Sequence, residues 1–234
     1  MSHDLKTFLQ DEYAHREERL SGSDLYSVFN PAYLYMVQQR QRQELALLRR
    51  HDIDHLKDKR ILEVGCGRGG ILSSLVSFGA RQHLLHGVDL IHDRVVGAQQ
   101  RFPAMQFTCA DGQRLPYAAA SFDLVVQYTA FSSILDDHIK AQVAQDMRRV
   151  LRPDGLILWY DFWLNPSNPQ TRGIRPAEIK RLFPGCRYDF RRVTLAPPLT
   201  RKLAARSWML CLLLEKLRLL NTHYLVIIQK QEPH

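Results

Sequence analysis

Short apolar runs alternate with helical segments between residues 60 and 160 of this 234-residue chain. Each run is nearly continuous, which predicts strands that are buried on both faces. Parallel strands need crossover connections, and the intervening helices supply them. The pattern therefore predicts an α/β fold with a mostly parallel sheet and helices on both faces. Strands are expected at 60–64, 83–88, 105–109, 122–127 and 156–160, and helices at 71–78, 93–101 and 136–151.

The segments on either side of this alternating part are organised differently. Residues 1–57 are expected to be mainly helical, and Asn30 before Pro31 is a typical helix start. The last third favours a short helix, a strand, a long helix and a final strand, at 175–183, 187–195, 199–220 and 223–230. We expect a single domain over 1–234, made of an N-terminal helical cap (1–57), a cofactor-binding core (58–160) and a C-terminal part (161–234).

Composition narrows the class of protein. The chain is 45% hydrophobic and 24% charged, as expected for a globular protein. Its four cysteines show no CxxC spacing, so we expect no metal site. The N-terminus has no secretory signal pattern, and no stretch reaches the roughly 18 apolar residues of a membrane span. We therefore expect a cytoplasmic enzyme.

The net charge of +8 leaves two interpretations open. A basic chain suits a nucleic-acid or anionic-membrane partner. It is more typical of an enzyme with a basic surface, because here the basic residues are spread along the chain, so a nucleic-acid partner is not expected.

A glycine-rich segment lies between the first expected strand and the first expected helix. Gly65, Gly67 and Gly70 fit the pattern G-x-G-x-x-G. Glycines allow a sharp turn and close approach of a ligand, and the helix start offers unpaired N–H groups. The pattern by itself fits NAD as well as other nucleotide-like ligands.

Three carboxylates near strand ends separate these ligands. Glu63, two residues before the loop, would repel a pyrophosphate but suits a cationic amino-acid group. Asp89 ends the second strand, where it can accept both hydroxyls of a ribose. Asp111 follows the third strand, where it can accept from an adenine amino group. The competing interpretation is that Glu63 and Asp111 cap a helix or turn.

These segments together resemble the class I S-adenosylmethionine-dependent methyltransferases, in the broad group that includes ubiquinone and menaquinone biosynthesis methyltransferases. The resemblance implies a Rossmann-like, seven-stranded, mostly parallel sheet whose last strand is antiparallel. It also implies S-adenosylmethionine as cofactor and S-adenosylhomocysteine as product. The matching segments are 61–69 (ILEVGCGRG), 87–90 (GVDL), 110–116 (ADGQRLP), 121–126 (SFDLVV) and 151–155 (LRPDG).

The resemblance also implies roles at the reacting end of the cofactor. Gly65 and Gly67 would lie beneath its methionine part, and Glu63 would organise its amino group. Gln127, at the end of the fourth expected strand, would face the sulfonium and the transferred methyl group.

At the adenosine end, the resemblance implies that Asp89 holds the ribose. Leu90 would pack near the adenine. Asp111 and Gly112 would recognise the adenine.

Methyl transfer is an in-line displacement in which the protein mainly aligns the nucleophile with the methyl group. An oxygen or carbon acceptor often needs a base, whereas a nitrogen acceptor needs only to be unprotonated. No pattern identifies a base. Tyr128, His138 and Asp161 are weak candidates, and each also has a purely structural interpretation.

The acceptor is expected to be a small or medium-sized molecule, methylated at oxygen or nitrogen. Its pocket is expected to use Tyr26, Phe29, Tyr33 and Tyr35, together with the loop 162–172. That loop is rich in Asn and Pro, which favours a sugar or another secondary metabolite. The loop is otherwise only a connection to the next helix.

Two other functions remain open. Positive charge is compatible with an RNA methyltransferase, and a non-catalytic S-adenosylmethionine-binding partner subunit would carry the same motifs. DNA base methylation is disfavoured, because the Asn/Asp-Pro-Pro-aromatic signature does not follow the fourth expected strand. The basic residues that flank the apolar run in 199–220 fit either an anionic membrane surface or a helix buried on the sheet. Burial is the expectation.

Overall fold

A seven-stranded sheet forms the centre of the computed structural model, which describes residues 22–165 and 170–231. The strand order is β3-β2-β1-β4-β5-β7-β6. Neighbours among β1 to β5 pair in parallel, and β7 runs antiparallel to both β5 and β6. The predicted fold class is therefore confirmed. The strands are β1 (Ile61–Val64), β2 (Leu85–Asp89), β3 (Gln106–Cys109), β4 (Phe122–Tyr128), β5 (Leu151–Phe162), β6 (Cys186–Leu195) and β7 (Asn221–Lys230).

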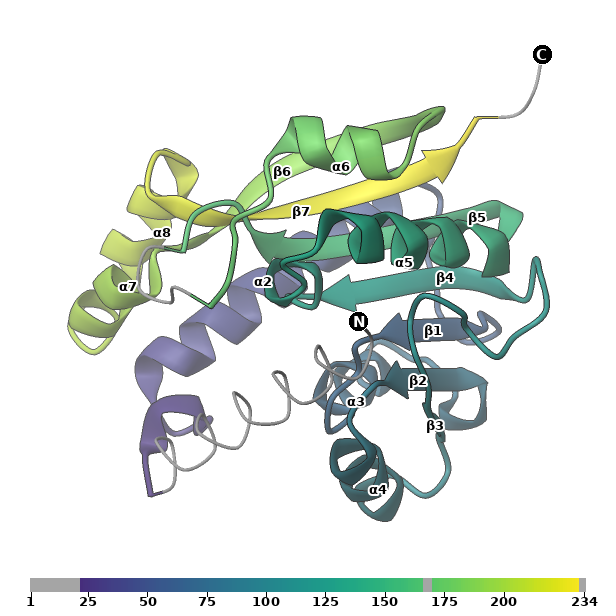
Figure 1. Cartoon of the computed structure of the whole chain (residues 1–234). Helices are drawn as coiled ribbons and strands as arrows, with labels where there is room; N and C mark the ends of the chain where they lie inside the picture. The colour runs from purple at the N-terminus through teal and green to yellow at the C-terminus, as the bar shows by residue number, and fades with distance from the viewer. Residues whose placement is uncertain (1–21, 166–169, 232–234) are drawn as a thin grey trace.

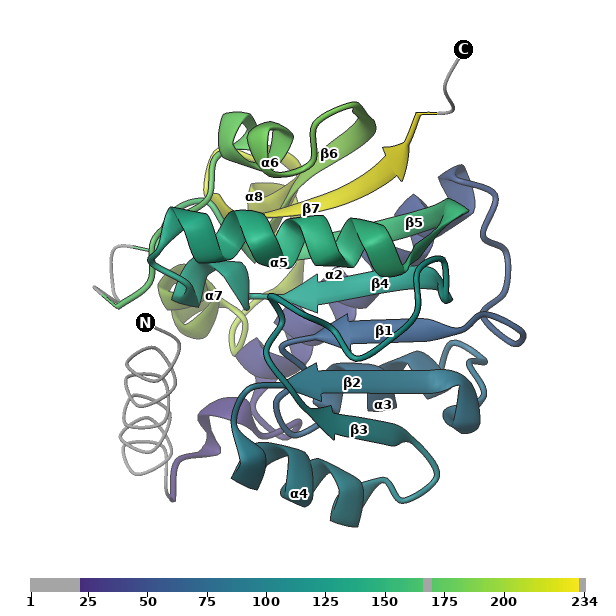
Figure 2. The same ribbon diagram turned by 45° about the vertical axis from the view of Figure 1, so that its right-hand side comes forward.

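Helices cover both faces of this sheet (Figures 1 and 2). On one face, α5 and α6 pack against a core that includes Leu62, Val125 and Ile157. On the other face, α2 and α3 pack against the alternate residues of the same strands. The described helices are α2 (Pro31–Arg50), α3 (Gly70–Val76), α4 (His92–Arg101), α5 (Asp137–Val150), α6 (Pro176–Leu182), α7 (Pro197–Leu203) and α8 (Trp208–Lys216), with 3-10 turns η1 (Asp24–Tyr26), η2 (Gln82–Leu84) and η3 (Phe131–Ser133).

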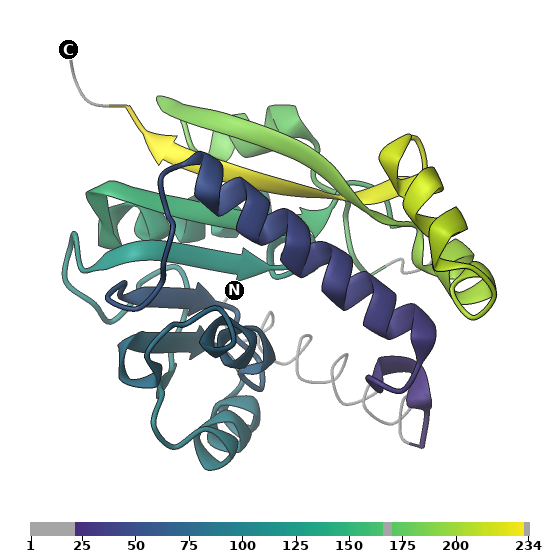
Figure 3. The same ribbon diagram turned by 180° about the vertical axis from the view of Figure 1, so that it is seen from behind.

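The start of α2 follows the sequence expectation. The Asn30 side chain accepts hydrogen bonds from the backbone N–H groups of Ala32 (3.0 Å) and Tyr33 (3.3 Å), and Pro31 occupies the first helical position. From there α2 crosses the back of the sheet diagonally (Figure 3). The predictions made for residues 1–21 lie outside the described part of the chain.

The prediction of one long helix over 199–220 is wrong. The segment forms α7 and α8, separated by a break where Ser207 caps the second helix by accepting from the N–H of Leu210. The prediction that this segment is buried on the sheet is also wrong. The pair packs beside α2 at one end of the sheet, and Met209 and Leu213 of α8 are 67% and 54% exposed.

No helix in the described ranges 22–165 and 170–231 combines the length and the apolar character needed to cross a membrane.

Candidate functional site

A cavity of about 480 Å³ lies where β1, β2 and β4 end. The carboxyl ends of parallel strands are where ligands bind in open α/β sheets, and this volume is typical of small-molecule sites. Of the eight predicted cofactor residues, its wall includes Gly65, Asp89, Leu90, Asp111 and Gly112. The other predicted residues, Glu63, Gly67 and Gln127, lie behind the wall.

The glycine turn, residues 65–69, depends on its glycines for two separate reasons. Gly65 and Gly67 have φ angles of 77° and 53°, in the left-handed region that disfavours other residues. A Cβ atom at Gly65 would lie 2.7 Å from Cβ of Ala130, and one at Gly67 would lie 2.4 Å from the guanidinium of Arg94. By contrast, a Cβ atom at Gly70 would meet nothing within 4 Å. The third glycine of the pattern therefore has no steric role.

Asp89 joins the glycine turn to the end of β2. Its Oδ2 accepts from the N–H of Gly67 at 2.7 Å, and its Oδ1 accepts from the N–H of Ile91 at 3.0 Å. An ionised carboxylate has about four lone-pair sites. The two backbone bonds therefore leave capacity for ligand hydroxyls, on a side chain that borders the cavity.

Arg94 is a cavity residue that sequence reasoning missed. Its Nη1 lies 3.8 Å from Oδ2 of Asp89, and its side chain forms part of the cavity wall. The available signal was its position in the first turn of α4, directly after the strand end that carries Asp89. A guanidinium here can bind a ligand carboxylate or balance the charge of Asp89.

Asp111 borders the cavity but already has partners within its own turn. Its Oδ1 accepts from the backbone N–H of Gln113 and its Oδ2 from the Gln113 side-chain amide, both at 2.9 Å. The turn-capping interpretation thus describes its present contacts. A role in binding adenine stays a prediction, and each oxygen keeps lone-pair capacity for it.

Glu63 is almost completely buried behind the glycine turn. The backbone N–H of Leu72 bonds to the carboxylate, but Oε2 has no hydrogen-bond partner in the described part of the chain. Burial raises the pKa of Glu63 well above its usual value, and the charge of Asp89 raises it further. A buried carboxylate oxygen without a partner calls for an explanation, and a cationic ligand group held at the glycine turn would supply one.

Gln127 does not face the cavity, contrary to the role predicted for it. It is fully buried, its Oε1 accepts from the N–H of Ala130 at 3.1 Å, and its Nε2 donates to the carbonyl of Tyr160 at 3.4 Å. Both ends of the amide therefore stabilise the chain reversal after β4. The residues of that reversal, Tyr128 to Phe131, form the cavity wall instead.

The reversal after β4 has an unusual backbone. Thr129 has φ = 55°, although a β-branched residue strongly disfavours the left-handed region. The N–H of Thr129 donates to the carbonyl of Tyr160 at 2.8 Å, which helps to hold this conformation. Strained residues of this kind cluster at functional sites.

Of the three weak base candidates, Tyr128 alone borders the cavity. Burial raises the pKa of Tyr128 well above its usual value, and the neighbouring Glu44 carboxylate of α2 raises it further. Its phenol is therefore neutral at physiological pH. The hydroxyl itself is buried beside Glu44, so Tyr128 contributes to the cavity wall but cannot remove a proton from an acceptor.

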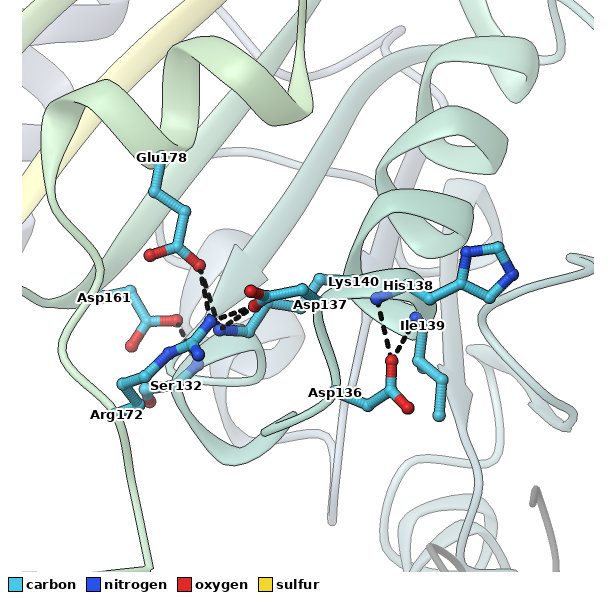
Figure 4. Close-up of polar contacts among 9 residues, drawn as sticks. All are labelled: Ser132, Asp136, Asp137, His138, Ile139, Lys140, Asp161, Arg172 and Glu178. Carbon is cyan, nitrogen blue, oxygen red and sulfur yellow. Dashed lines mark hydrogen bonds and ion pairs between the residues drawn. The ribbon is translucent and has the colours of Figure 1, made fainter.

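Asp161 and His138 lie elsewhere (Figure 4). Asp161 is buried, and its oxygens accept from the N–H groups of Phe162 (2.8 Å) and Ser132 (3.1 Å). Burial raises the pKa of Asp161 to about 6. His138 is exposed on α5, where its ring lies 3.3 Å from the Gln142 amide. Neither side chain borders the cavity, so the structure does not place either as a base there.

An ion pair on α2 packs against the side chain of Tyr128. Nε of Arg40 lies 3.0 Å from Oε1 of Glu44, both on α2. The Arg40 guanidinium lies 5.4 Å from the ring centre of Tyr128 and 5.6 Å from that of Tyr160, within cation–π range. The pair thereby holds the tyrosine ring that forms part of the cavity wall.

The N-terminal aromatic residues contribute less to the acceptor side than predicted. Tyr33 borders the cavity, and Tyr26 packs edge-on against it at 5.6 Å. Phe29 is 93% exposed. Tyr35 is turned away, because its hydroxyl donates to Glu215 at 2.7 Å. The N-cap at Asn30 fixes where α2 begins, and thereby which of its side chains face the cavity.

The loop 162–172 does not border the cavity in its described residues, contrary to the expectation that it forms the acceptor pocket. Arg172 pairs with Asp137 and Glu178 (Figure 4), and Asn165 donates to Thr171 at 2.9 Å. Residues 166–169 lie outside the described part. The described polar groups of the loop therefore bond to their own surroundings rather than to a ligand.

Comparison with known proteins finds similarity to methyltransferases across the core. The methyltransferase domain family matches residues 61–155. A phthiotriol/phenolphthiotriol dimycocerosates methyltransferase of Mycobacterium ulcerans is 37% identical over 120 residues, covering 48% of this chain and 40% of that protein. A fatty-acid O-methyltransferase of Mycolicibacterium smegmatis is 34% identical over 108 residues, covering 45% of this chain and 38% of that protein. The chain thus spans less than half the length of these relatives.

The fold is also found in solved structures. That of a SAM-dependent methyltransferase from Archaeoglobus fulgidus matches with a TM-score of 0.57 and 20% identity, over 85% of this chain and 99% of that one. At this identity the likeness concerns the fold.

Proposed function

Because the chain belongs to the class I S-adenosylmethionine-dependent methyltransferases, we propose that it transfers the cofactor's methyl group to an oxygen or nitrogen atom of a small acceptor with an apolar body. When bound, S-adenosylmethionine supplies an electrophilic methyl group on a sulfonium. The protein then has to hold the cofactor, align the acceptor and exclude water.

The residues of the cavity fit this cofactor. Gly65 borders the cavity and would lie beneath the methionine part, and the unpartnered Oε2 of Glu63 suits a cationic ammonium group. The free lone pairs of Asp89 suit the ribose hydroxyls. Leu90 and Gly112 provide wall for the adenine. We further propose that 1–234 acts as one unit, in which α2 of the cap closes the cavity through Tyr33.

The observation that carries the acceptor proposal is the lack of a competent base among the described cavity residues. The two carboxylates of the cavity wall, Asp89 and Asp111, are assigned to the cofactor, and Tyr128 is neutral. An acceptor that arrives unprotonated avoids the problem. A carboxylate, whose pKa is about 4, is ionised at neutral pH and needs no base. An amine needs only its unprotonated fraction.

The other cavity walls favour an apolar acceptor body. Phe131, Ile134 and Ile139 line them, with hydroxyls from Thr129 and Ser133. The relatives described above are named for fatty acids and for phthiotriol dimycocerosates, which agrees with this lining. The sugar hypothesis loses its main support, because the described part of the Asn- and Pro-rich loop lies away from the cavity.

Radiolabelled S-adenosylmethionine offered with separate acceptor pools tests the proposal. Long-chain carboxylic acids and apolar amines should become labelled in preference to sugars. Label appearing in RNA would favour the RNA methyltransferase alternative. If S-adenosylhomocysteine binds tightly but no pool is labelled, the non-catalytic partner-subunit alternative replaces the proposal. The variant Asp89→Ala serves as the cofactor-free control.

A further inference from the structure

An unusual apolar surface covers α8 and the turn that follows it. Cys211 and Glu215 are the buried residues of α8, and Leu212 and Leu214 are partly buried beside them. Leu210 and Leu213 point outwards. Helices at the surface normally turn their apolar side to the core. We call the exposed set the apolar patch; it consists of Met209 (67% exposed), Leu210 (42%), Leu213 (54%), Leu217 (64%), Leu219 (74%) and Leu220 (47%).

Within residues 197–220, which carry the apolar patch, every exposed charge is positive. Residues 197–220 contain five basic side chains, all exposed. The one acidic residue in this range, Glu215, is buried and accepts from the Tyr35 hydroxyl and from the N–H of Thr194. This segment therefore presents five positive charges beside the leucines. The basic residues are Arg201, Lys202, Arg206, Lys216 and Arg218.

The patch lies at the end of the sheet where the cavity is found. In Figures 1 and 3, α7 and α8 stand beside the first turns of α2, beyond the carboxyl end of β4. Trp208 of α8 packs edge-on against Tyr35 of α2 at 5.7 Å, and Tyr33 on the same turn of α2 borders the cavity. A surface that engages the patch would therefore meet the protein at the same end of the sheet as the cavity, on the other side of α2.

We propose that α7 and α8 bind the surface of an anionic lipid bilayer, with α8 lying in the interface. The leucines enter the boundary between headgroups and acyl chains, and the basic side chains pair with anionic headgroups. A second copy of the chain fits less well, since a twofold contact would bring two sets of five positive charges together. A nucleic acid would satisfy the charges but leave the leucines exposed to water. Binding at this end of the sheet would bring the bilayer close to the side of α2 that borders the cavity and so favour a lipid acceptor, and this last step rests on the proposed function.

Vesicle flotation with the full chain tests the proposal. Phosphatidylcholine vesicles containing phosphatidylglycerol should carry the protein upwards, and pure phosphatidylcholine vesicles should carry far less. Salt should weaken the binding, because exposed charges are screened. Replacing both Arg201 and Lys202 by Gln should lower the partition coefficient roughly 10-fold to 30-fold.

Matched variants separate the patch from general surface effects. Leu213→Glu should abolish flotation, whereas Leu45→Glu, at a leucine of α2 that is 44% exposed, should leave it unchanged. Circular dichroism and S-adenosylhomocysteine binding confirm that both variants fold. The proposal fails if the wild-type chain does not float with anionic vesicles at low salt, or if the two variants behave alike. It also fails if the patch instead forms a dimer that does not bind vesicles.

This test is independent of turnover. A chain that floats but methylates no acceptor retains the membrane proposal and loses the proposed function. A chain that methylates a dispersed acceptor but never floats does the reverse.

Discussion

The close approach between Gly65 and Ala130 makes Gly65→Ala a quantitative test of the glycine turn. Two costs add at this position. A non-glycine residue in the left-handed region costs about 1–2 kcal/mol, and φ here is 77°. Overpacking costs typically about 1–3 kcal/mol more, because the new Cβ would lie 2.7 Å from Cβ of Ala130. We expect the free energy of unfolding to fall by about 2–5 kcal/mol in total.

Gly79→Ala provides the matched control. Gly79 has φ = 90°, but a Cβ atom there would meet nothing within 4 Å. The free energy of unfolding of Gly79→Ala should therefore fall only by the backbone cost of about 1–2 kcal/mol. Its affinity for the cofactor should not change. Gly65 and Ala130 both border the cavity. A clash of about 1–3 kcal/mol that moves this wall would weaken cofactor binding roughly 5-fold to 150-fold.

A double-mutant cycle isolates the clash. In Gly65→Ala with Ala130→Gly, the nearest heavy atom to the new Cβ is Cα of residue 130, at 3.9 Å. Urea unfolding should give a coupling energy of about 1–3 kcal/mol between the two positions. Calorimetry with S-adenosylhomocysteine should recover most of the lost affinity. Equal stability losses in Gly65→Ala and Gly79→Ala, together with unchanged affinity, would refute the close-approach argument.

Three further predictions concern carboxylates and the buried ion pair. Asp89→Asn should abolish cofactor binding in calorimetry and lower the free energy of unfolding by about 1–3 kcal/mol. The reason is that its amide NH2 group would face one of the two backbone N–H donors that now bind carboxylate oxygens. Unchanged binding would count against the ribose role. Burial raises the pKa of Asp161 from 3.8 to about 6, so the folded state binds the extra proton between these pH values, and stability should fall as pH rises through them. Urea unfolding across this range should show a decline of about 3 kcal/mol that Asp161→Asn lacks, and parallel curves would contradict the assignment. Arg40→Met should cost about 3–5 kcal/mol because it leaves Glu44 buried and unpaired; Arg40→Met with Glu44→Leu should recover most of it in the same assay, and no recovery would exclude the charge as the cause.

Much of the fold follows from local patterns in the sequence. The apolar runs predict β1 to β5 to within a few residues, apart from the earlier start of β5 at Leu151. Asn30 and Pro31 locate the start of α2, since capping depends on neighbours two or three residues away. The positions of the glycine turn and of Asp89 can likewise be predicted from the sequence. Residues at the carboxyl ends of parallel strands lie at one edge of the sheet, where ligands bind.

The contacts that decide individual roles depend on residues distant in sequence. Gln127 is directed away from the cavity by bonds to Ala130 and Tyr160. Arg94 lies against Gly67 because the folded chain places the start of α4 beside the glycine turn. Likewise, the apolar run in 199–220 gives no sign of which side it buries. Composition and periodicity determine which segments are strands and helices. Only the tertiary structure decided that α8 meets just the end of β6, beside α2, because its Cys211 packs with Leu195 of β6 and Tyr35 of α2 while its other side stays exposed.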